Sequence, residues 1–297
     1  MWKLVIPALA VALTGCGGGG GSTGTANAGK SADAIVASTS FTIAGYVENC
    51  GCNPTLVAGE FRGGGIKYVV VSGWRAGNTL MPVKIYRLDN NGTTEDATTD
   101  ILGTDLQFSV NFPVIADFNN DGWLDLFHVN GFSGGGDASV SPFLEDYSQL
   151  FISDQNGGFL ERAIPLGISD NRQGRGIVCF DYDRDGDIDL FIANNRQAPV
   201  LYRNDSTSNG NYLNIKLEGE QKNSEAVGAR IYLTTNGITQ MRELRVGSNY
   251  MSQNPVEAHF GLGTATAADM IRIVWPSGTE KILEDVDANQ MLFISLP

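Results

Sequence analysis

An acidic loop that occurs twice constrains this chain more than any other feature of its sequence. The segments ADFNNDGWLDLF (residues 116–127) and FDYDRDGDIDLF (residues 180–191) align without gaps and share the pattern D-x-[DN]-x-D-G-x-x-D. Two carboxylates about 5 Å apart repel by roughly 3 kcal/mol at an effective dielectric near 20. Four or five on one tight loop would cost an amount comparable with the stability of a whole domain, about 5–15 kcal/mol. A positive ion is therefore expected among them.

The spacing predicts how each loop would hold that ion. As in an EF-hand loop, positions 1, 3 and 5 offer side-chain oxygens, position 6 is the turn glycine and position 7 offers a backbone carbonyl. Position 7 is Trp123 in one copy and Asp187 in the other, which agrees with backbone ligation and makes the Asp187 side chain a bystander. The glutamate of position 12 is missing, and position 9 supplies an aspartate instead.

Hard oxygen ligands in this number favour Ca²⁺ over Zn²⁺ or Mg²⁺, so we expect about two calcium ions. The second loop, with four carboxylates against three and an amide, is expected to bind more tightly. The alternative, a merely solvated acidic turn, is disfavoured by the matched spacing of two copies. The expected ligands are Asp117, Asn119, Asp121, Trp123 and Asp125 in one loop and Asp181, Asp183, Asp185, Asp187 and Asp189 in the other.

Each acidic loop belongs to a longer repeat. Short β-prone runs flank the loops, and a second landmark follows at residues 150–157 and 201–205. A third copy at residues 59–71 has Arg62 and Tyr68 in place of acidic residues, so no ion is expected there. The 37 glycines and the low charged fraction of 18% are typical of short strands joined by tight turns. The sequence predicts an all-β fold with about three copies of one unit.

The N-terminus predicts export. Lys3 is followed by an apolar run to Leu13 and then by Gly15 and Cys16, which is the pattern of a lipoprotein signal peptide with Cys16 as the lipidated residue. Because Gly17 stands where an aspartate often retains lipoproteins in the inner membrane, we expect a lipid anchor in the bacterial outer membrane or at the cell surface. The predicted segments are a signal peptide (residues 1–15) and a flexible Gly/Ser-rich tether (residues 16–40).

The other cysteines have separate interpretations. Cys50 and Cys52 are close enough in sequence to bond to each other, or to hold a soft metal. Cys179 lies in an apolar run and is expected to be a buried small side chain.

With Phe118 and Tyr182 at the second position, the acidic loops resemble the FG-GAP/VCBS repeats of integrin-like β-propellers, in which each blade carries a Ca²⁺ loop between strands. The segments NYLNIKLEGEQKNSEAVGARI, GSNYMSQNP, HFGLG, WPSG and ANQ are similar to successive signatures of an ASPIC/UnbV domain. The order of the two resembles the cartilage acidic protein-like family. The resemblance implies propeller-type blades over residues 41–210 and an ASPIC/UnbV-like domain over residues 211–297. Hydrophobic and polar residues alternate in the strands expected in this C-terminal segment, which predicts a β-sandwich or barrel.

The number of expected blades does not determine how the propeller would close into a ring. Propellers of this kind usually have about seven blades and closed propellers need at least four, whereas the sequence supplies about three. Either the C-terminal domain packs across the gap, or degenerate strands near residues 41–56 contribute, or two chains complete each other.

Two polar features of the C-terminal segment have a structural and a functional interpretation. His259 is expected to be a packed, hydrogen-bonded residue rather than a ligand or acid. The polar cluster of Tyr250, Ser252, Gln253 and Asn254 is expected to form a structural turn, with recognition of a glycan or protein as the alternative.

Composition and motifs favour a non-catalytic protein. The net charge of −13 without a Lys/Arg cluster argues against a nucleic-acid surface. There are two histidines and neither an H-E-x-x-H nor a G-x-S-x-G motif, so an enzyme is not expected. We expect a calcium-stabilised envelope lipoprotein that binds an extracellular or envelope protein or glycan as an adhesion scaffold, through loops such as residues 130–141. The alternatives are a self-assembling homo-oligomeric structural protein and a carboxylate-dependent glycan-active enzyme.

Overall fold

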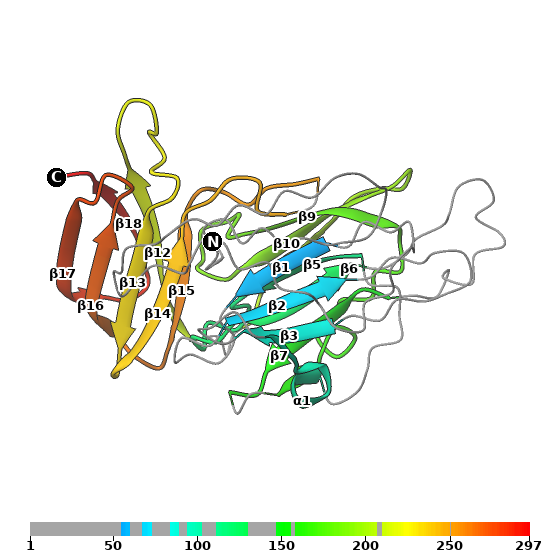
Figure 1. The fold of residues 1–297 in the computed structure, drawn as a ribbon. Helices are drawn as coiled ribbons and strands as arrows, with labels where there is room; N and C mark the ends of the chain where they lie inside the picture. The colour runs from blue at the N-terminus through cyan, green and yellow to red at the C-terminus, as the bar shows by residue number, and fades with distance from the viewer. Residues whose placement is uncertain are drawn as a thin grey trace, which may run out of the picture.

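The structure, a computed structural model, is nearly all β. It describes residues 55–59, 67–72, 84–88, 94–102, 111–129, 147–155, 158–206, 210–249 and 251–297. These residues form 18 strands and one short helix, α1 (Thr98–Leu102), in five sheets (Figure 1). The predicted all-β class is therefore confirmed. Within the described ranges, no helix has the length and apolar character needed to cross a membrane.

Several sequence predictions concern residues outside the described ranges. They are the signal peptide (1–15) with lipidated Cys16, the tether (16–40), residues 41–54 of the extra strands expected near 41–56, the pair Cys50 and Cys52, Arg62 of the third copy, the loop 130–141 and Tyr250.

Three antiparallel sheets repeat one design in the N-terminal part. Their orders are β1-β2-β3-β4, β5-β6-β7-β8 and β11-β10-β9, and each is an open sheet, as in propeller-like blades. The first strands of the three sheets, β1, β5 and β9, contact one another in succession. The bounds are β1 (Thr55–Gly59), β2 (Lys67–Ser72), β3 (Lys84–Leu88), β4 (Thr94–Asp96), β5 (Asn111–Ala116), β6 (Asp125–Val129), β7 (Gln149–Ser153), β8 (Phe159–Glu161), β9 (Gly174–Phe180), β10 (Asp189–Asn194) and β11 (Val200–Tyr202).

The acidic loops occupy the same place in their sheets. Loop 1 (residues 117–125) joins β5 to β6, and loop 2 (residues 181–189) joins β9 to β10. In both hairpins the aspartate at the ninth position opens the second strand and pairs with the last residue of the first, Ala116 with Asp125 and Phe180 with Asp189. The prediction that each loop connects strand to strand is confirmed.

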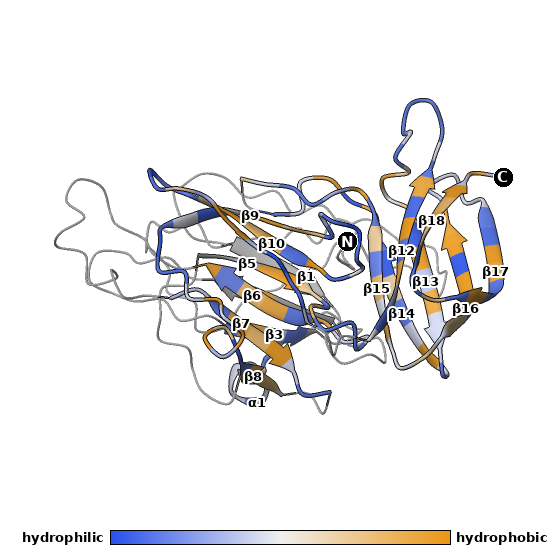
Figure 2. Cartoon of the chain, turned by 180° about the vertical axis from the view of Figure 1, so that it is seen from behind, coloured by the Kyte–Doolittle hydropathy of each residue, from blue (hydrophilic) through white to orange (hydrophobic). Residues whose placement is uncertain are grey.

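The C-terminal part is a sandwich of two sheets, β15-β12-β18 and β14-β13-β16-β17. Alternate residues of β13 are buried, as are Ile271 and Ile273 of β16, and Figure 2 shows the alternation of hydropathy along these strands. Because side chains alternate between the faces of a strand, one face of each sheet fills the core. The bounds are β12 (Asn211–Glu218), β13 (Arg230–Thr235), β14 (Ile238–Glu243), β15 (Ala258–Gly263), β16 (Ala267–Val274), β17 (Glu280–Asp287) and β18 (Gln290–Ser295).

The edge of β9 is covered by side chains of the C-terminal part. Ser252 Oγ lies 3.1 Å from the Ile177 amide and 2.8 Å from its carbonyl, and Asn254 Oδ1 accepts the Cys179 amide at 2.9 Å. Asn249 Nδ2 also donates to the Ile177 carbonyl, at 2.8 Å. Ser252 and Asn254 thus have the structural role that the sequence favoured, and the C-terminal part packs against the third sheet.

Candidate metal centres

The ninth-position aspartates hold both acidic loops in shape. Asp125 accepts the amides of Phe118 and Ser153, each at 2.8 Å. In the same way Asp189 accepts the amides of Tyr182 at 3.0 Å and Asn204 at 2.8 Å. One donor is the second residue of the loop, and the other lies in the second landmark of the repeat. The landmark residues were missed as part of the site, although Ser153 and Asn204 occupy the same place in their landmarks.

The first-position aspartates bind the turn of each loop. Asp117 Oδ2 accepts the Gly122 amide at 2.8 Å, and Asp181 Oδ2 accepts the Gly186 amide at 3.0 Å. Gly122 has a φ of 91° and Gly186 a φ of 97°, a backbone region that residues with a Cβ rarely adopt. The sixth-position glycines are therefore required by the turn itself.

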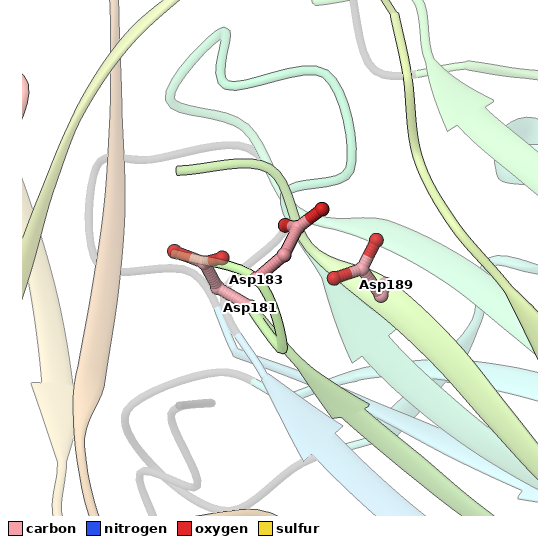
Figure 3. A group of neighbouring side chains, drawn as sticks. All are labelled: Asp181, Asp183 and Asp189. Carbon is pink, nitrogen blue, oxygen red and sulfur yellow. The ribbon is translucent and has the colours of Figure 1, made fainter. Parts of the chain in front are cut away.

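Loop 2 brings three carboxylates together (Figure 3). Asp181, Asp183 and Asp189 each offer one oxygen, and these oxygens lie within 4.8 Å of one another. Since Ca²⁺ binds oxygens at 2.3–2.6 Å, two ligands of one ion can be up to about 5 Å apart. The three side chains therefore satisfy the distance requirement for a shared calcium ion.

The donor set of loop 2 also fits a cation chemically. Asp181 and Asp189 are 3% and 0% exposed, and Asp181 Oδ1 is buried without a hydrogen-bond partner. A buried charged oxygen without a partner is expensive, and a coordinated cation would satisfy it. The Arg203 guanidinium lies 3.9 Å from Asp183, but its side chain is 51% exposed, so solvent screens this charge.

Burial raises the proton affinity of both loops. Desolvation raises the pKa of Asp189 to about 6 and that of Asp117 to about 7. Asp121 adds to the rise at Asp117, and the buried guanidinium of Arg242 opposes it. Desolvation also raises the pKa of Asp125 well above its usual value. Burial therefore disfavours the bare carboxylate at these positions, and a bound cation would stabilise the ionised form.

Loop 1 is held by hydrogen bonds to the carboxylate of Asp121. Asp121 Oδ2 accepts Asn119 Nδ2 at 3.0 Å and Gln155 Nε2 at 2.9 Å, and Asp121 Oδ1 accepts the Trp123 amide at 2.8 Å. In the described part of the chain, the trio of loop 2 is the group of three acidic or histidine residues close enough to share an ion. The ligand set of loop 1 stays a prediction.

The remaining acidic residues of loop 2 have other partners. Asp185 Oδ1 accepts the amide of Asp187 at 3.0 Å. Asp187 Oδ1 accepts Asn120 Nδ2 of loop 1 at 2.8 Å, so this side chain joins the two loops.

A buried chain of polar side chains connects both loops to the C-terminal part. Asn214 of β12 donates from Nδ2 to Asp181 Oδ2 at 3.1 Å, and its Oδ1 lies 2.8 Å from His259 Nδ1. His259 Nε2 lies 2.6 Å from Asn120 Oδ1. His259 is 4% exposed, and burial lowers its pKa. The expectation that His259 is a packed, hydrogen-bonded residue is confirmed.

Close backbone approaches accompany this polar chain. A Cβ on Gly261 of β15 would lie 2.1 Å from Asp117 Oδ2 and 2.5 Å from the Asn120 carbonyl carbon. A Cβ on Gly186 would lie 1.8 Å from the ring of Tyr212, the residue that stacks on His259. Both acidic loops therefore lie in the interface between the N-terminal sheets and the C-terminal sandwich.

Comparison with protein families agrees with this division of the chain. Residues 219–297 match the ASPIC and UnbV family, and residues 63–128, which include loop 1, match the FG-GAP-like repeat. These two segments are therefore similar to an FG-GAP-like repeat and to an ASPIC/UnbV domain. Loop 2 lies between the two matched regions.

The chain is also homologous to cartilage acidic protein 1. It is 29% identical over 184 residues to the Homo sapiens protein and 27% identical over 205 residues to the Mus musculus protein. These alignments cover 58% and 64% of this chain but 26% and 30% of the relatives. A structure of sucrose-6-phosphate hydrolase from Lactobacillus gasseri is 15% identical and covers 80% of this chain and 62% of its own, but its TM-score of 0.26 carries no argument.

Proposed function

We propose that this protein is a calcium-stabilised, non-catalytic scaffold that is lipid-anchored to the bacterial outer membrane or cell surface through Cys16 and binds an envelope or extracellular protein or glycan. The observation that carries the proposal is the convergence of Asp181, Asp183 and Asp189, and it is supported by a buried oxygen of Asp181 that has no hydrogen-bond partner. The FG-GAP-like repeat and the ASPIC/UnbV domain suggest an extracellular repeat protein.

Calcium would make this arrangement stable at neutral pH. Asp181, Asp183 and Asp189 would hold one ion, with Asp185 and the carbonyl of Asp187 as further ligands. The ion supplies the positive charge that lets buried carboxylates stay ionised. A second ion in loop 1 would be held by Asp117, Asn119, Asp121, Trp123 and Asp125.

The positions of the histidines support a non-catalytic role. His128 is 0% and His259 is 4% exposed, so neither side chain is placed to meet a substrate. The acidic residues with raised pKa values lie in the loops proposed to hold calcium, where both carboxylate oxygens of Asp125 and Asp189 already accept backbone amides.

Calorimetry tests the proposal on the chain without its first 40 residues. A ligand at 100 times its dissociation constant stabilises a protein by about 2.7 kcal/mol. At about 2–4 °C per kcal/mol, CaCl₂ should raise the Tm by roughly 5–10 °C relative to EDTA. Asp181→Asn should lose much of this increase, whereas Asp269→Asn, at an exposed position of β16, should keep it. An equal Tm in EDTA and CaCl₂ for the unsubstituted chain would refute the calcium assignment.

The envelope anchor has its own test. In a bacterial host the chain should incorporate labelled palmitate and fractionate with membranes, and Cys16→Ser should do neither. Incorporation that survives this substitution would refute the assignment of Cys16.

A further inference from the structure

The carboxylate of Asp181 is oriented by Asn214, a residue of the C-terminal sandwich. Its Oδ2 accepts two donors, the Gly186 amide of its own loop and Asn214 Nδ2 of β12. Its Oδ1 is buried and has no hydrogen-bond partner. The hydrogen bonds therefore fix one oxygen away from the proposed ion and leave the other available to it.

Asn214 is itself held in one orientation. It is 2% exposed, and its Oδ1 lies 2.8 Å from His259 Nδ1. Turning the amide over would bring its oxygen against Asp181 Oδ2, so donation from Nδ2 to the carboxylate is the favourable arrangement. The second ring nitrogen of His259 faces Asn120 Oδ1 of loop 1. The amide is thus fixed between loop 2 and a ring that contacts loop 1.

The same domain also covers the turn of loop 2. The ring of Tyr212, two residues before Asn214 in β12, occupies the space that a Cβ on Gly186 would need. The backbone of this turn supplies the amide that binds Asp181 Oδ2. Docking of β12 therefore fixes both donors to this carboxylate oxygen.

We propose that Asn214 is a positioning residue for the calcium site of loop 2, so that binding of the ion and docking of the C-terminal sandwich are thermodynamically linked. This inference rests on the proposed calcium site. Residues that orient metal ligands typically contribute 10- to 100-fold to metal affinity. Because linkage is reciprocal, the ion strengthens docking by the same factor that docking strengthens binding of the ion.

Calcium titration calorimetry of the full chain in detergent tests whether Asn214 positions the calcium site. Asn214→Leu has a similar size but cannot donate, and Asn214→Asp keeps the shape while placing a second acceptor beside Asp181. Both variants should lower the calcium affinity of loop 2 by 10- to 100-fold, and Asp181→Asn should remove this site. The control is Asn254→Leu, because Asn254 is a 1% exposed amide of the same interface whose oxygen accepts the Cys179 amide rather than contacting loop 2. It should lower the Tm in EDTA but leave the calcium affinity within about twofold.

Hydrogen exchange of the unsubstituted chain tests whether calcium binding and docking are linked, and it does not depend on the folding of a variant. Calcium should slow exchange of amides in β12 and β15 about as much as it slows those of loop 2. If exchange slows in loop 2 alone, the linkage is wrong and the calcium site stands. If Asn214→Leu and Asn254→Leu change the affinity equally, Asn214 is not a positioning residue and the calcium site again stands. If the unsubstituted chain takes up no calcium, both the site and the linkage are wrong.

Discussion

Raising the pH should destabilise the protein when calcium is removed. Asp117 is 2% exposed and its pKa is raised from 3.8 to about 7, chiefly by burial. The native state therefore keeps a proton that the unfolded chain releases near pH 4. Stability from this proton is fully present below pH 3.8 and is lost as the pH rises through 7. Asp189, with a pKa raised to about 6, acts in the same direction.

The size of the effect follows from the pKa of Asp117. One pKa unit corresponds to 1.36 kcal/mol, so a rise from 3.8 to about 7 amounts to about 4 kcal/mol. Urea denaturation in EDTA at several pH values between 4 and 8 measures the free energy of unfolding, with fluorescence of Trp123 and Trp275 as the signal. We expect a decline of about 2–4 kcal/mol over this range. Excess CaCl₂ should flatten the profile, because the ion takes the place of the proton.

The matched variant is Asp117→Asn, which mimics the protonated carboxyl group. In EDTA its stability should depend less on pH than that of the unsubstituted protein, and it should be the more stable of the two at pH 8. A free energy of unfolding that stays level or increases between pH 4 and 7 in EDTA would refute the reasoning, as would an unchanged slope in Asp117→Asn.

Three further predictions concern packing. Gly261→Ala should lower the Tm by roughly 2–12 °C in thermal denaturation, since overpacking costs about 1–3 kcal/mol and the clash involves loop 1 backbone, whereas Gly176→Ala meets ordinary contacts at 3.5 Å and should change the Tm by less than about 2 °C. Gly186→Ala should destabilise the protein and weaken calcium binding, and in a double-mutant cycle Tyr212→Ala should recover part of the loss; strict additivity of the two substitutions would contradict the contact. Cys179 is 3% exposed and burial raises the pKa of its thiol, so a thiol reagent at pH 8 should not modify it until urea unfolds the protein, and rapid modification of the native thiol would contradict its burial.

Local features of the fold and the site could be predicted from the sequence. Matched spacing of acidic residues located both loops between strands, because the turn and its ligands lie within nine consecutive positions. Alternating hydrophobic residues likewise predicted β12 and β16. The apolar run around Cys179 predicted its burial.

The contacts between distant segments could not be predicted in this way. Asn214 bonds to a residue 33 positions earlier, and the side chains of Asn120 and His259 meet across 139 positions. No local pattern records such pairs, because they depend on how the sandwich docks against the sheets. The sequence also did not predict that the carboxylates of the two loops have different partners, because the spacing of their acidic residues is identical. In loop 1, Gln155 contacts Asp121 from outside the loop.

The side chains of Ser252 and Asn254, which cover the edge of β9, have a consequence for solubility. An open strand edge offers unpaired amide and carbonyl groups to any extended peptide, and such edges are where sheet proteins join into fibres. Here the Ile177 amide donates to the Ser252 hydroxyl and the Cys179 amide donates to the Asn254 carboxamide. These side chains cannot pair with a further strand, so the sheet is not extended. Ser252 and Asn254 thus protect the edge of the third sheet, much as a terminal repeat protects the end of a solenoid.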